Sequence, residues 1–244
     1  MDDRYIREEH GTREEWLEAR RSMPGSLGAS DAGALLGISP WRTIDDLYDE
    51  ALGLKAPKDL SKNPAVRFGT KAEASIRELV ALDLADILTV EHHPYDILRL
   101  KDAPYIFCTL DGDLSRKSDG ARGVLEIKTG RYNPDWEDGL PAYYYAQVCQ
   151  QLLVTGWDFA IVAGRLTQGR PSLSGEWANL PARFPQVVWV YRYIDAKDPA
   201  VAKSMRTIRA AAEEYHKHVQ QGRRPATRVA FGKKTEAKEG FFTW

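Results

Sequence analysis

The sequence predicts an α/β fold in which a small mixed β-sheet is flanked by helices on both faces. Two patterns lead to this prediction. An amphipathic helical period over residues 68–84 gives way to three strand-like segments between residues 95 and 130, and a helix, two strands and a long helix follow. With 244 residues, 43% hydrophobic and 28% charged, the chain can build one substantial core. We expect a single domain over residues 1–222 and a basic, mobile tail over residues 223–244.

Three helices are expected within the first 53 residues. Residues 13–21 place Trp16, Leu17 and Arg20 or Arg21 at helical spacing, and the Gly- and Pro-containing stretch that follows ends this helix. Ser30 is a good N-cap for a second helix, and a third helix ends at Gly53. Residues 55–67 are basic and contain two prolines, which predicts an exposed loop.

In the middle and C-terminal parts, segments with helical periodicity alternate with segments that have the two-residue periodicity of strands. Thr70 is the expected N-cap of the helix over residues 68–84, whose apolar residues form one stripe. The later elements are predicted as strands over residues 95–100, 105–114 and 123–130, a helix over 141–156, strands over 158–166 and 186–194, and a helix over 198–221.

Bulk properties narrow the class of protein. We find no signal peptide and no apolar run of the roughly 18 residues that a membrane span needs, so a cytoplasmic protein is expected. Cys108 and Cys149 lack the neighbours of a zinc or iron–sulfur site and are expected to be buried thiols. The formal net charge of −1 neither indicates nor excludes a nucleic-acid partner, because binding depends on local patches.

The segment "GVLEIKTG", residues 123–130, places two opposite charges in an otherwise apolar strand. Because side chains alternate along a strand, Val124, Glu126 and Lys128 share one face. The simplest interpretation is a structural salt bridge on a half-exposed strand. A second interpretation is that Glu126 helps to bind a metal ion, which requires a further carboxylate from a neighbouring segment.

Asp111 and Asp113 lie at the end of the preceding predicted strand. If the two strands pair, a carboxylate from the first comes close to Glu126 on the second. Two carboxylates and a backbone carbonyl suit a hard cation such as Mg²⁺, whose remaining positions are left to water and phosphate oxygens. Lys128 beside such an ion would orient the attacking water and stabilise a pentavalent phosphate.

The pattern "LDGDL…LEIKTG" resembles the Asp and Glu-x-Lys core of the PD-(D/E)XK nuclease superfamily. Three further blocks, "EEWLEARRSMPGSLGASDAGALLGISPW", "FGTKAEASIREL" and "AYYYAQVCQQLLVTG", resemble in order the blocks of the YqaJ-like viral recombinase nucleases, relatives of the lambda-type phage exonuclease. The similarity spans roughly residues 13–222. It implies a restriction-endonuclease-like core and metal-dependent cleavage of DNA.

The resemblance implies roles for the central residues. Asp111, Glu126 and the carbonyl of Ile127 would bind one or two Mg²⁺ ions, for which Mn²⁺ would substitute, and Lys128 would activate water. Glu73 matches the acidic residue that reaches the second metal or its water. An alternative for Glu73 is a capping box with Thr70, and one residue could serve both roles.

Two other blocks imply supporting residues. Gln147 and Tyr144 match a helix that packs beside the metal site, whereas Tyr143 and Tyr145 are expected to be packing residues.

Arg20 and Ser30 match a pocket for a DNA 5′-phosphate, and Arg21 is the alternative to Arg20. Trp41 is expected to pack, with base stacking as the second interpretation.

Three features depart from the family pattern or extend it. Leu110 stands where a Pro usually precedes the first Asp, and Asp113 is extra, either assisting the metal or closing the turn. The stretch between the last two strands, residues 165–186, is long for a hairpin loop, and is either a DNA- or subunit-facing insertion or a disordered excursion.

The resemblance predicts a Mg²⁺-dependent exonuclease that degrades one strand of linear duplex DNA from its 5′ end and leaves a 3′ single strand for recombination. The same resemblance implies a ring-shaped homotrimer and a single-strand annealing protein as partner. The alternatives are an endonuclease or flap nuclease of the superfamily, and a catalytically silent DNA-binding module. A Cas4-like nuclease is disfavoured because the cysteine cluster is missing.

Overall fold

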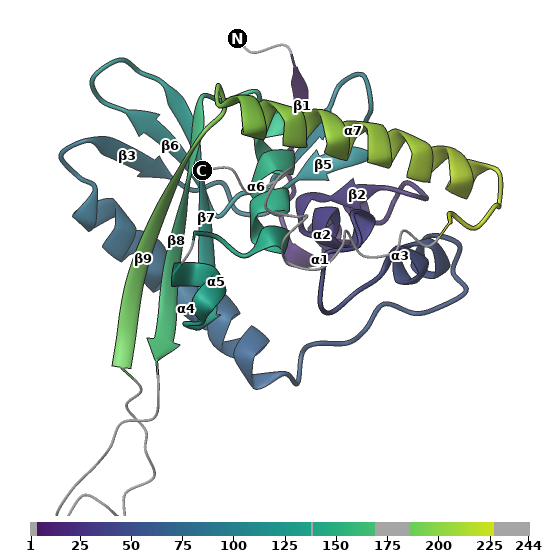
Figure 1. Ribbon diagram of the computed structural model, residues 1–244, viewed down its shortest axis with the longest axis horizontal. Coiled ribbons are helices and arrows are strands. Elements are labelled where there is room, and N and C mark those ends of the chain that lie inside the picture. The colour runs from purple at the N-terminus through teal and green to yellow at the C-terminus, as the bar shows by residue number, and fades with distance from the viewer. Residues whose placement is uncertain (1–3, 138, 169–185, 227–244) are drawn as a thin grey trace, which may run out of the picture.

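The computed structural model describes residues 4–137, 139–168 and 186–226 (Figure 1). The larger of its two β-sheets has five strands. Their order is β3 (Leu88–Glu91), β6 (Gly112–Arg116), β7 (Arg122–Arg131), β8 (Phe159–Gln168) and β9 (Gln186–Asp195). β7 and β8 are parallel and the other neighbours are antiparallel, so the sheet is mixed as expected. β7, β8 and β9 are the long strands of this sheet, and the longest pairings are those of β8 with β7 and with β9.

A second sheet has four short strands in the order β1 (Tyr5–Glu8), β4 (Ile97–Leu100), β5 (Ile106–Cys108) and β2 (Leu27–Gly28). The prediction of one continuous strand over residues 105–114 is wrong, because this segment divides into β5 and β6, which belong to different sheets. The three residues between them, 109–111, bridge the two sheets. β1, β2 and β3 were not expected, since strands of four residues or fewer carry too little alternation to be recognised.

Seven α-helices and a 3₁₀ turn are found within the described ranges. They are α1 (Arg13–Ala19), η1 (Ala29–Asp31), α2 (Ala32–Leu35), α3 (Ile44–Ala51), α4 (Pro64–Asp83), α5 (Pro134–Glu137), α6 (Ala142–Thr155) and α7 (Pro199–Gln220). None of them is long and apolar enough to cross a membrane.

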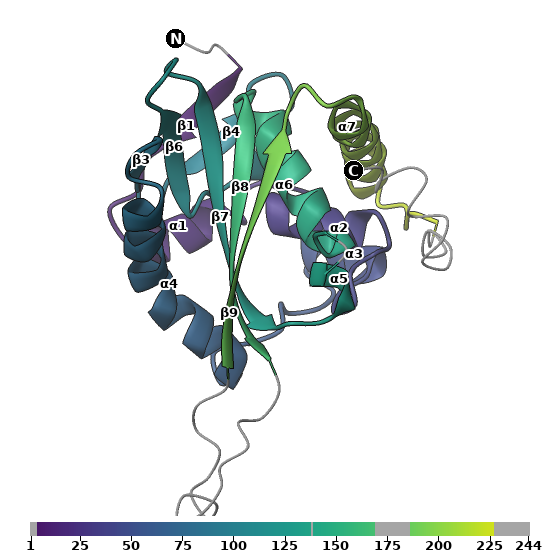
Figure 2. The ribbon, with the colours of Figure 1, turned by 60° about the vertical axis from the view of Figure 1, so that its left-hand side comes forward.

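The helices cover both faces of the larger sheet. Figure 2 shows α4 on one side of β6–β9 and α6, with α7 behind it, on the other. The side chains of β7 divide accordingly. Leu125 and Ile127 join an apolar cluster with Ile76 of α4, whereas Val124 packs into the larger core formed with α6. The expected alternation of β7 is therefore confirmed, and Glu126 faces α6.

Two helix starts differ from the sequence prediction. α4 begins six residues before Thr70, because Asn63 caps it through bonds to the amides of Ala65 and Val66, and Pro64 fits the first turn. The predicted loop over residues 55–67 therefore ends early. Ser30 is not an N-cap: it lies inside η1, and no side chain caps α2.

Some expectations concern residues that the structure does not describe. Most of the basic tail and most of the 165–186 stretch lie outside the described residues. The division into a domain over 1–222 and a tail over 223–244 stays a prediction.

Candidate active site

The candidate site lies at an open part of the edge of β7. β6 pairs with β7 only as far as the Gly112–Leu125 pair, whereas β8 pairs with β7 over nine residues. Beyond Leu125 the place of β6 is taken by Asp111, whose Oδ2 accepts a hydrogen bond of 2.7 Å from the amide of Ile127. The N–H and C=O of an extended residue point to the same edge, so the carbonyl of Ile127 also faces Asp111.

Glu126 and Lys128 extend from the same face of β7 toward α6. Lys128 Nζ lies 2.5 Å from Glu126 Oε1, and both side chains are largely buried. Gln147 of α6 joins the pair: its Nε2 donates to Glu126 Oε1 at 2.7 Å, and its Oε1 accepts from Lys128 Nζ at 3.0 Å. The structure thus brings together three residues that the sequence singled out.

A second glutamine, Gln151, binds the other oxygen of Glu126. Its Nε2 donates to Glu126 Oε2 at 2.5 Å and to the carbonyl of Thr109 at 3.2 Å, and the side chain is fully buried. Sequence reasoning did not include Gln151 in the site. The signal was its position one helical turn after Gln147, which places both amides on one face of α6.

From the opposite side of the sheet, α4 contributes Glu73 and Arg77. Arg77 Nη2 donates to Glu73 Oε1 at 2.7 Å, and its Nε donates to the carbonyl of Asp111 at 2.5 Å. The capping box between Thr70 and Glu73 is wrong, since Thr70 lies in the interior of α4. Arg77 was not predicted as a site residue. It binds the backbone carbonyl of Asp111, just as Gln151 binds the backbone carbonyl of Thr109.

Burial is the largest electrostatic effect at the site, and the close carboxylates add to it. Burial, and then the neighbouring carboxylates of Glu126 and Glu73, raise the pKa of Asp111 well above its usual value. Burial also raises the pKa of Glu73, against the influence of Arg77. Burial alone would lower the pKa of Lys128, but the carboxylates of Glu126 and Asp111 more than offset it, so the pKa is raised and the amine stays protonated.

The donors fit a hard divalent cation better than a transition metal. Among the residues that the structure describes, no three His, Cys, Asp or Glu side chains cluster closely enough to hold an ion by themselves. The available oxygens are those of Asp111, Glu126 and the Ile127 carbonyl, with water or a phosphate to complete the shell. Burial and the neighbouring carboxylates both disfavour the charged form of Asp111, and a bound divalent cation would favour it.

Three tyrosines of α6 follow one another in sequence, and one of them lies over the lysine. The ring of Tyr144 lies 4.5 Å from Lys128 Nζ, within cation–π distance. Tyr145 is buried in the core, as expected. Tyr143 is only partly buried and packs on Tyr144. Trp41 is 67% exposed and touches Tyr143 edge-on, so it is not a core residue.

Arg20 lies in an aromatic setting with its donors free. Its guanidinium lies 4.4 Å from the centre of the Trp16 ring and 5.8 Å from that of Phe107. The guanidinium group makes no hydrogen bond or ion pair with any other residue that the structure describes, and Asp31 is the nearby acid that acts on its charge. Burial lowers the pKa of Arg20. A guanidinium held by rings with unused N–H groups suits an incoming phosphate.

Ser30 and Arg21 are both exposed, and neither contacts Arg20 through a side-chain hydrogen bond in the described part of the chain. Ser30 lies next to Asp31, whose carboxylate accepts from the amide of Gly28. The structure therefore places Ser30 beside the acid that influences Arg20 but does not form a closed pocket from the two.

Asp113 does not contribute to the site. It is buried and pairs with Arg7 at 2.9 Å and with Arg122 at 3.2 Å, which links β6 to β1 and to the start of β7. In the described part of the chain no hydrogen bond or ion pair joins Asp113 to Asp111, Glu126 or Lys128. It lies within β6 rather than in a turn. Cys108 and Cys149 are both buried, as expected.

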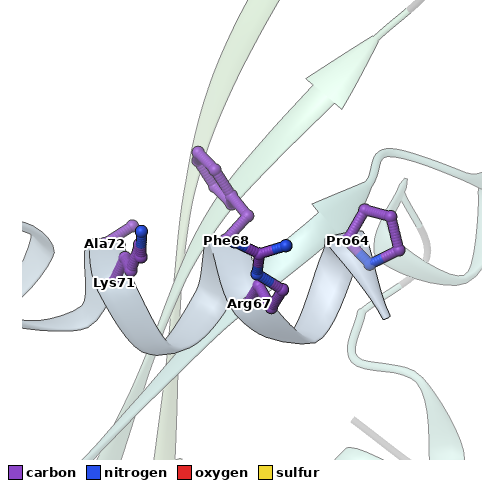
Figure 3. A pocket seen from close by; sticks show the side chains of 5 residues that line it. All are labelled: Pro64, Arg67, Phe68, Lys71 and Ala72. Atoms are coloured by element: carbon purple, nitrogen blue, oxygen red, sulfur yellow. The ribbon is translucent and has the colours of Figure 1, made fainter. Parts of the chain in front are cut away.

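A shallow groove of about 430 Å³ lies on the first half of α4, lined by Pro64, Arg67, Phe68, Lys71 and Ala72 (Figure 3). The guanidinium of Arg165 on β8 lies 5.3 Å from the Phe68 ring. Arg67, Lys71 and Arg165 form no ion pair with any described residue. Thr129 packs against Gly69 of α4, so the groove lies close to the end of the Glu126–Lys128 segment.

Comparison with known proteins identifies the family. The model of the YqaJ-like viral recombinase domain matches residues 15–158, more than half of the chain. The chain belongs to this family. Among curated proteins, the uncharacterized protein YqaJ of Bacillus subtilis (strain 168) is 27% identical over 216 residues, which cover 84% of this chain and 63% of YqaJ. The chain thus spans less than two thirds of that relative.

Solved structures show the same fold. The alkaline exonuclease LHK-Exo from Laribacter hongkongensis has a TM-score of 0.52 at 19% identity, over 85% of this chain and 95% of LHK-Exo. A phage-related exonuclease from Haemophilus somnus 129PT has a TM-score of 0.50 at 12% identity, over 84% of this chain and 99% of that one. The expected restriction-endonuclease-like α/β fold is confirmed.

Proposed function

We propose that this member of the YqaJ-like viral recombinase domain family is a divalent-metal-dependent deoxyribonuclease. It would hydrolyse one strand of linear duplex DNA from the 5′ end and leave a 3′ single strand for recombination. The observation that carries the proposal is the convergence of Asp111, Glu126 and Lys128 at the open edge of β7, held by two glutamines and an arginine. A structural salt bridge would need neither the crowded second carboxylate nor these supports.

The residues have distinct chemical roles. Asp111, Glu126 and the carbonyl of Ile127 would hold Mg²⁺, with Glu73 reaching a second ion or its water. When bound, the ion supplies a water of lowered pKa and a Lewis acid for phosphate oxygens. Lys128 stays protonated beside Glu126, so its role is to donate hydrogen bonds to the attacking water and to the charge that develops on phosphate. Gln147 fixes the direction of that ammonium group.

The supports determine how well the ligands are preorganised. Gln151 and Gln147 each bind one oxygen of Glu126, which limits rotation of its carboxylate. Arg77 and Gln151 hold the 109–111 segment from opposite faces of the sheet. Ligands that are held before the ion arrives lose little conformational freedom when it binds.

Arg20 supports recognition of a 5′-phosphate. Its free N–H groups and the flanking Trp16 and Phe107 rings give a rigid donor fork for a terminal phosphate. Ser30 would assist through its exposed hydroxyl. Polarity from 5′ to 3′ follows if this phosphate is the feature that positions the strand.

Digestion of defined DNA tests the proposal. A linear duplex with a 5′-phosphate should be degraded in Mg²⁺ and preserved in EDTA, and the circular form of the same DNA should resist. Lys128→Met and Glu126→Gln should lose cleavage while retaining the thermal unfolding transition, and the exposed Lys203→Ala serves as the matched control. Cleavage of the circular form would favour an endonuclease, and unchanged activity in either site variant would exclude the assigned chemistry.

The assembly and setting are proposed on the same basis. A homotrimer and a single-strand annealing protein as partner are proposed from the family resemblance, and the cytoplasmic location from the sequence properties given above. Light scattering of the purified chain tests the trimer, and co-purification with an annealing protein from the same genome tests the partner.

A further inference from the structure

The strongest feature outside the metal site is a series of three aromatic rings that leads from the surface to the candidate catalytic lysine. Trp41, in the loop between α2 and α3, contacts Tyr143 with ring centres 4.6 Å apart and planes at 77°. Tyr143 contacts Tyr144 at 4.4 Å, and the Tyr144 ring lies 4.5 Å from Lys128 Nζ. The outermost ring, Trp41, is 67% exposed.

The position of Trp41 relative to Lys128 is restricted. The centres of the Trp41 and Tyr144 rings are 6.4 Å apart, and this step combined with the 4.5 Å from Tyr144 to Lys128 Nζ bounds the separation of Trp41 and the amine at about 11 Å. Successive stacked bases of one strand rise by about 3.4 Å. A base stacked on Trp41 would therefore belong to one of the three nucleotides nearest to the phosphate at Lys128.

The series is held in place by close packing. An added Cβ at Gly33 of α2 would lie 2.9 Å from the Cβ of Tyr143, so only glycine lets α2 approach α6 this closely. The amide of Trp41 donates to Ser39 Oγ at 3.3 Å. Fixed rings lose little entropy when a ligand stacks on them.

The chemistry of the two ends defines the ligand. One end is a large, exposed aromatic face, and the other is an ammonium group beside proposed metal ligands. A molecule that contacts both must carry a flat apolar ring and an anionic group within about 11 Å of each other. A nucleotide has this arrangement, whereas an apolar peptide would leave the charged end unmatched.

We propose that Trp41 is a stacking platform for an unpaired base of the DNA strand that enters the site. This inference rests on the proposed function and names a binding residue for the same site. Base stacking on an aromatic residue is worth about 1–3 kcal/mol, or about 5- to 150-fold in affinity. Contacts with Tyr143 and Tyr144 already occupy part of the Trp41 ring, so the lower part of this range, about 5- to 30-fold, is expected.

Binding in EDTA tests the platform apart from cleavage. A duplex with a frayed end should bind Trp41→Ala about 5- to 30-fold more weakly than the unchanged protein, and Trp41→Phe within about threefold. DNA should also quench tryptophan fluorescence less in Trp41→Phe. The control is Tyr193→Ala, since Tyr193 is a 52% exposed ring on β9 that stacks with Phe159.

DNA with abasic residues at the three terminal positions separates stacking from a structural effect. It should bind the unchanged protein as weakly as intact DNA binds Trp41→Ala, with no further loss in the variant. A loss that is equal for intact and abasic DNA, an affinity within twofold of the unchanged protein, or a changed oligomeric state in Trp41→Ala would each overturn the inference.

The two proposals fail in different ways. Trp41-dependent binding without Mg²⁺-dependent cleavage would remove the nuclease assignment and leave the platform. Normal cleavage with Trp41-independent binding would remove the platform alone. Absence of DNA binding by the unchanged protein would remove both.

Discussion

Replacing Gln151 by Leu should damage both stability and metal binding. The substitution keeps a buried side chain of similar volume and removes two donated bonds, one to a Glu126 oxygen and one to the carbonyl of Thr109. A bond to a charged group is worth about 1.5–3 kcal/mol and one between neutral groups about 0.5–1.5 kcal/mol. The free energy of unfolding should fall by about 3 kcal/mol, which lowers Tm by about 6–12 °C for a chain of this size.

The neighbouring glutamine provides the matched control. Gln150 is equally buried and donates to the carbonyls of Leu27 and Phe107 at 2.9 and 3.1 Å, away from Glu126. Gln150→Leu should lose about 1–3 kcal/mol of stability but keep the increase in Tm that Mg²⁺ produces in the unchanged protein. Gln151→Leu should need at least tenfold more Mg²⁺ for the same increase.

Differential scanning fluorimetry over a Mg²⁺ series measures both effects in one experiment. Equal Mg²⁺ responses in Gln150→Leu and Gln151→Leu would refute the positioning role of Gln151. A loss of stability below about 0.5 kcal/mol in Gln151→Leu would refute the hydrogen-bond reasoning itself.

Three further predictions concern the charges. Asp111→Asn should raise the Tm of the metal-free protein and abolish the increase in Tm that Mg²⁺ produces. The reason is that a carboxyl whose pKa is raised on folding costs stability increasingly as pH rises above the ordinary pKa of that carboxyl. A lower Tm of the variant at neutral pH, with the Mg²⁺ response intact, would contradict this. Lys128→Met should lower kcat by at least 100-fold while DNA still binds within about threefold, measured by single-turnover cleavage and anisotropy; an effect on binding alone would contradict the role in the transition state. Arg67→Ala and Lys71→Ala should each reduce the salt slope of duplex binding by about one, with Lys203→Ala unchanged; equal slopes in all variants would mean that the groove of Figure 3 does not contact phosphates.

Much of the fold was predictable because the long elements carry clear periods. α6, β8, β9 and α7 were all expected within about two residues of their observed bounds. The errors occurred where signals competed. Thr70 resembles an N-cap, but α4 begins earlier, after Asn63 and at Pro64. This start was missed because both residues lie in a polar stretch that was predicted to be a loop. The break at residues 109–111 was missed because the strand-like alternation of Ile106, Cys108 and Leu110 continues through it.

The site was predictable only in part for a similar reason. The alternation on β7 and the family resemblance together pointed to Asp111, Glu126, Lys128 and Gln147. They did not predict which hydrogen bonds these side chains make. Arg77 was not found, because its role depends on α4 crossing the 109–111 segment, which no local pattern records. The exposure of Trp41 likewise depends on how the α2–α3 loop lies on α6.

Manganese-soaked crystals examined by anomalous diffraction test the central claim most directly. The predicted result is a peak within bonding distance of the carboxylates of Asp111 and Glu126 and the carbonyl of Ile127, with Lys128 next to it. The contradicting result is an ordered, metal-free edge of β7 in crystals whose protein cleaves DNA with Mn²⁺.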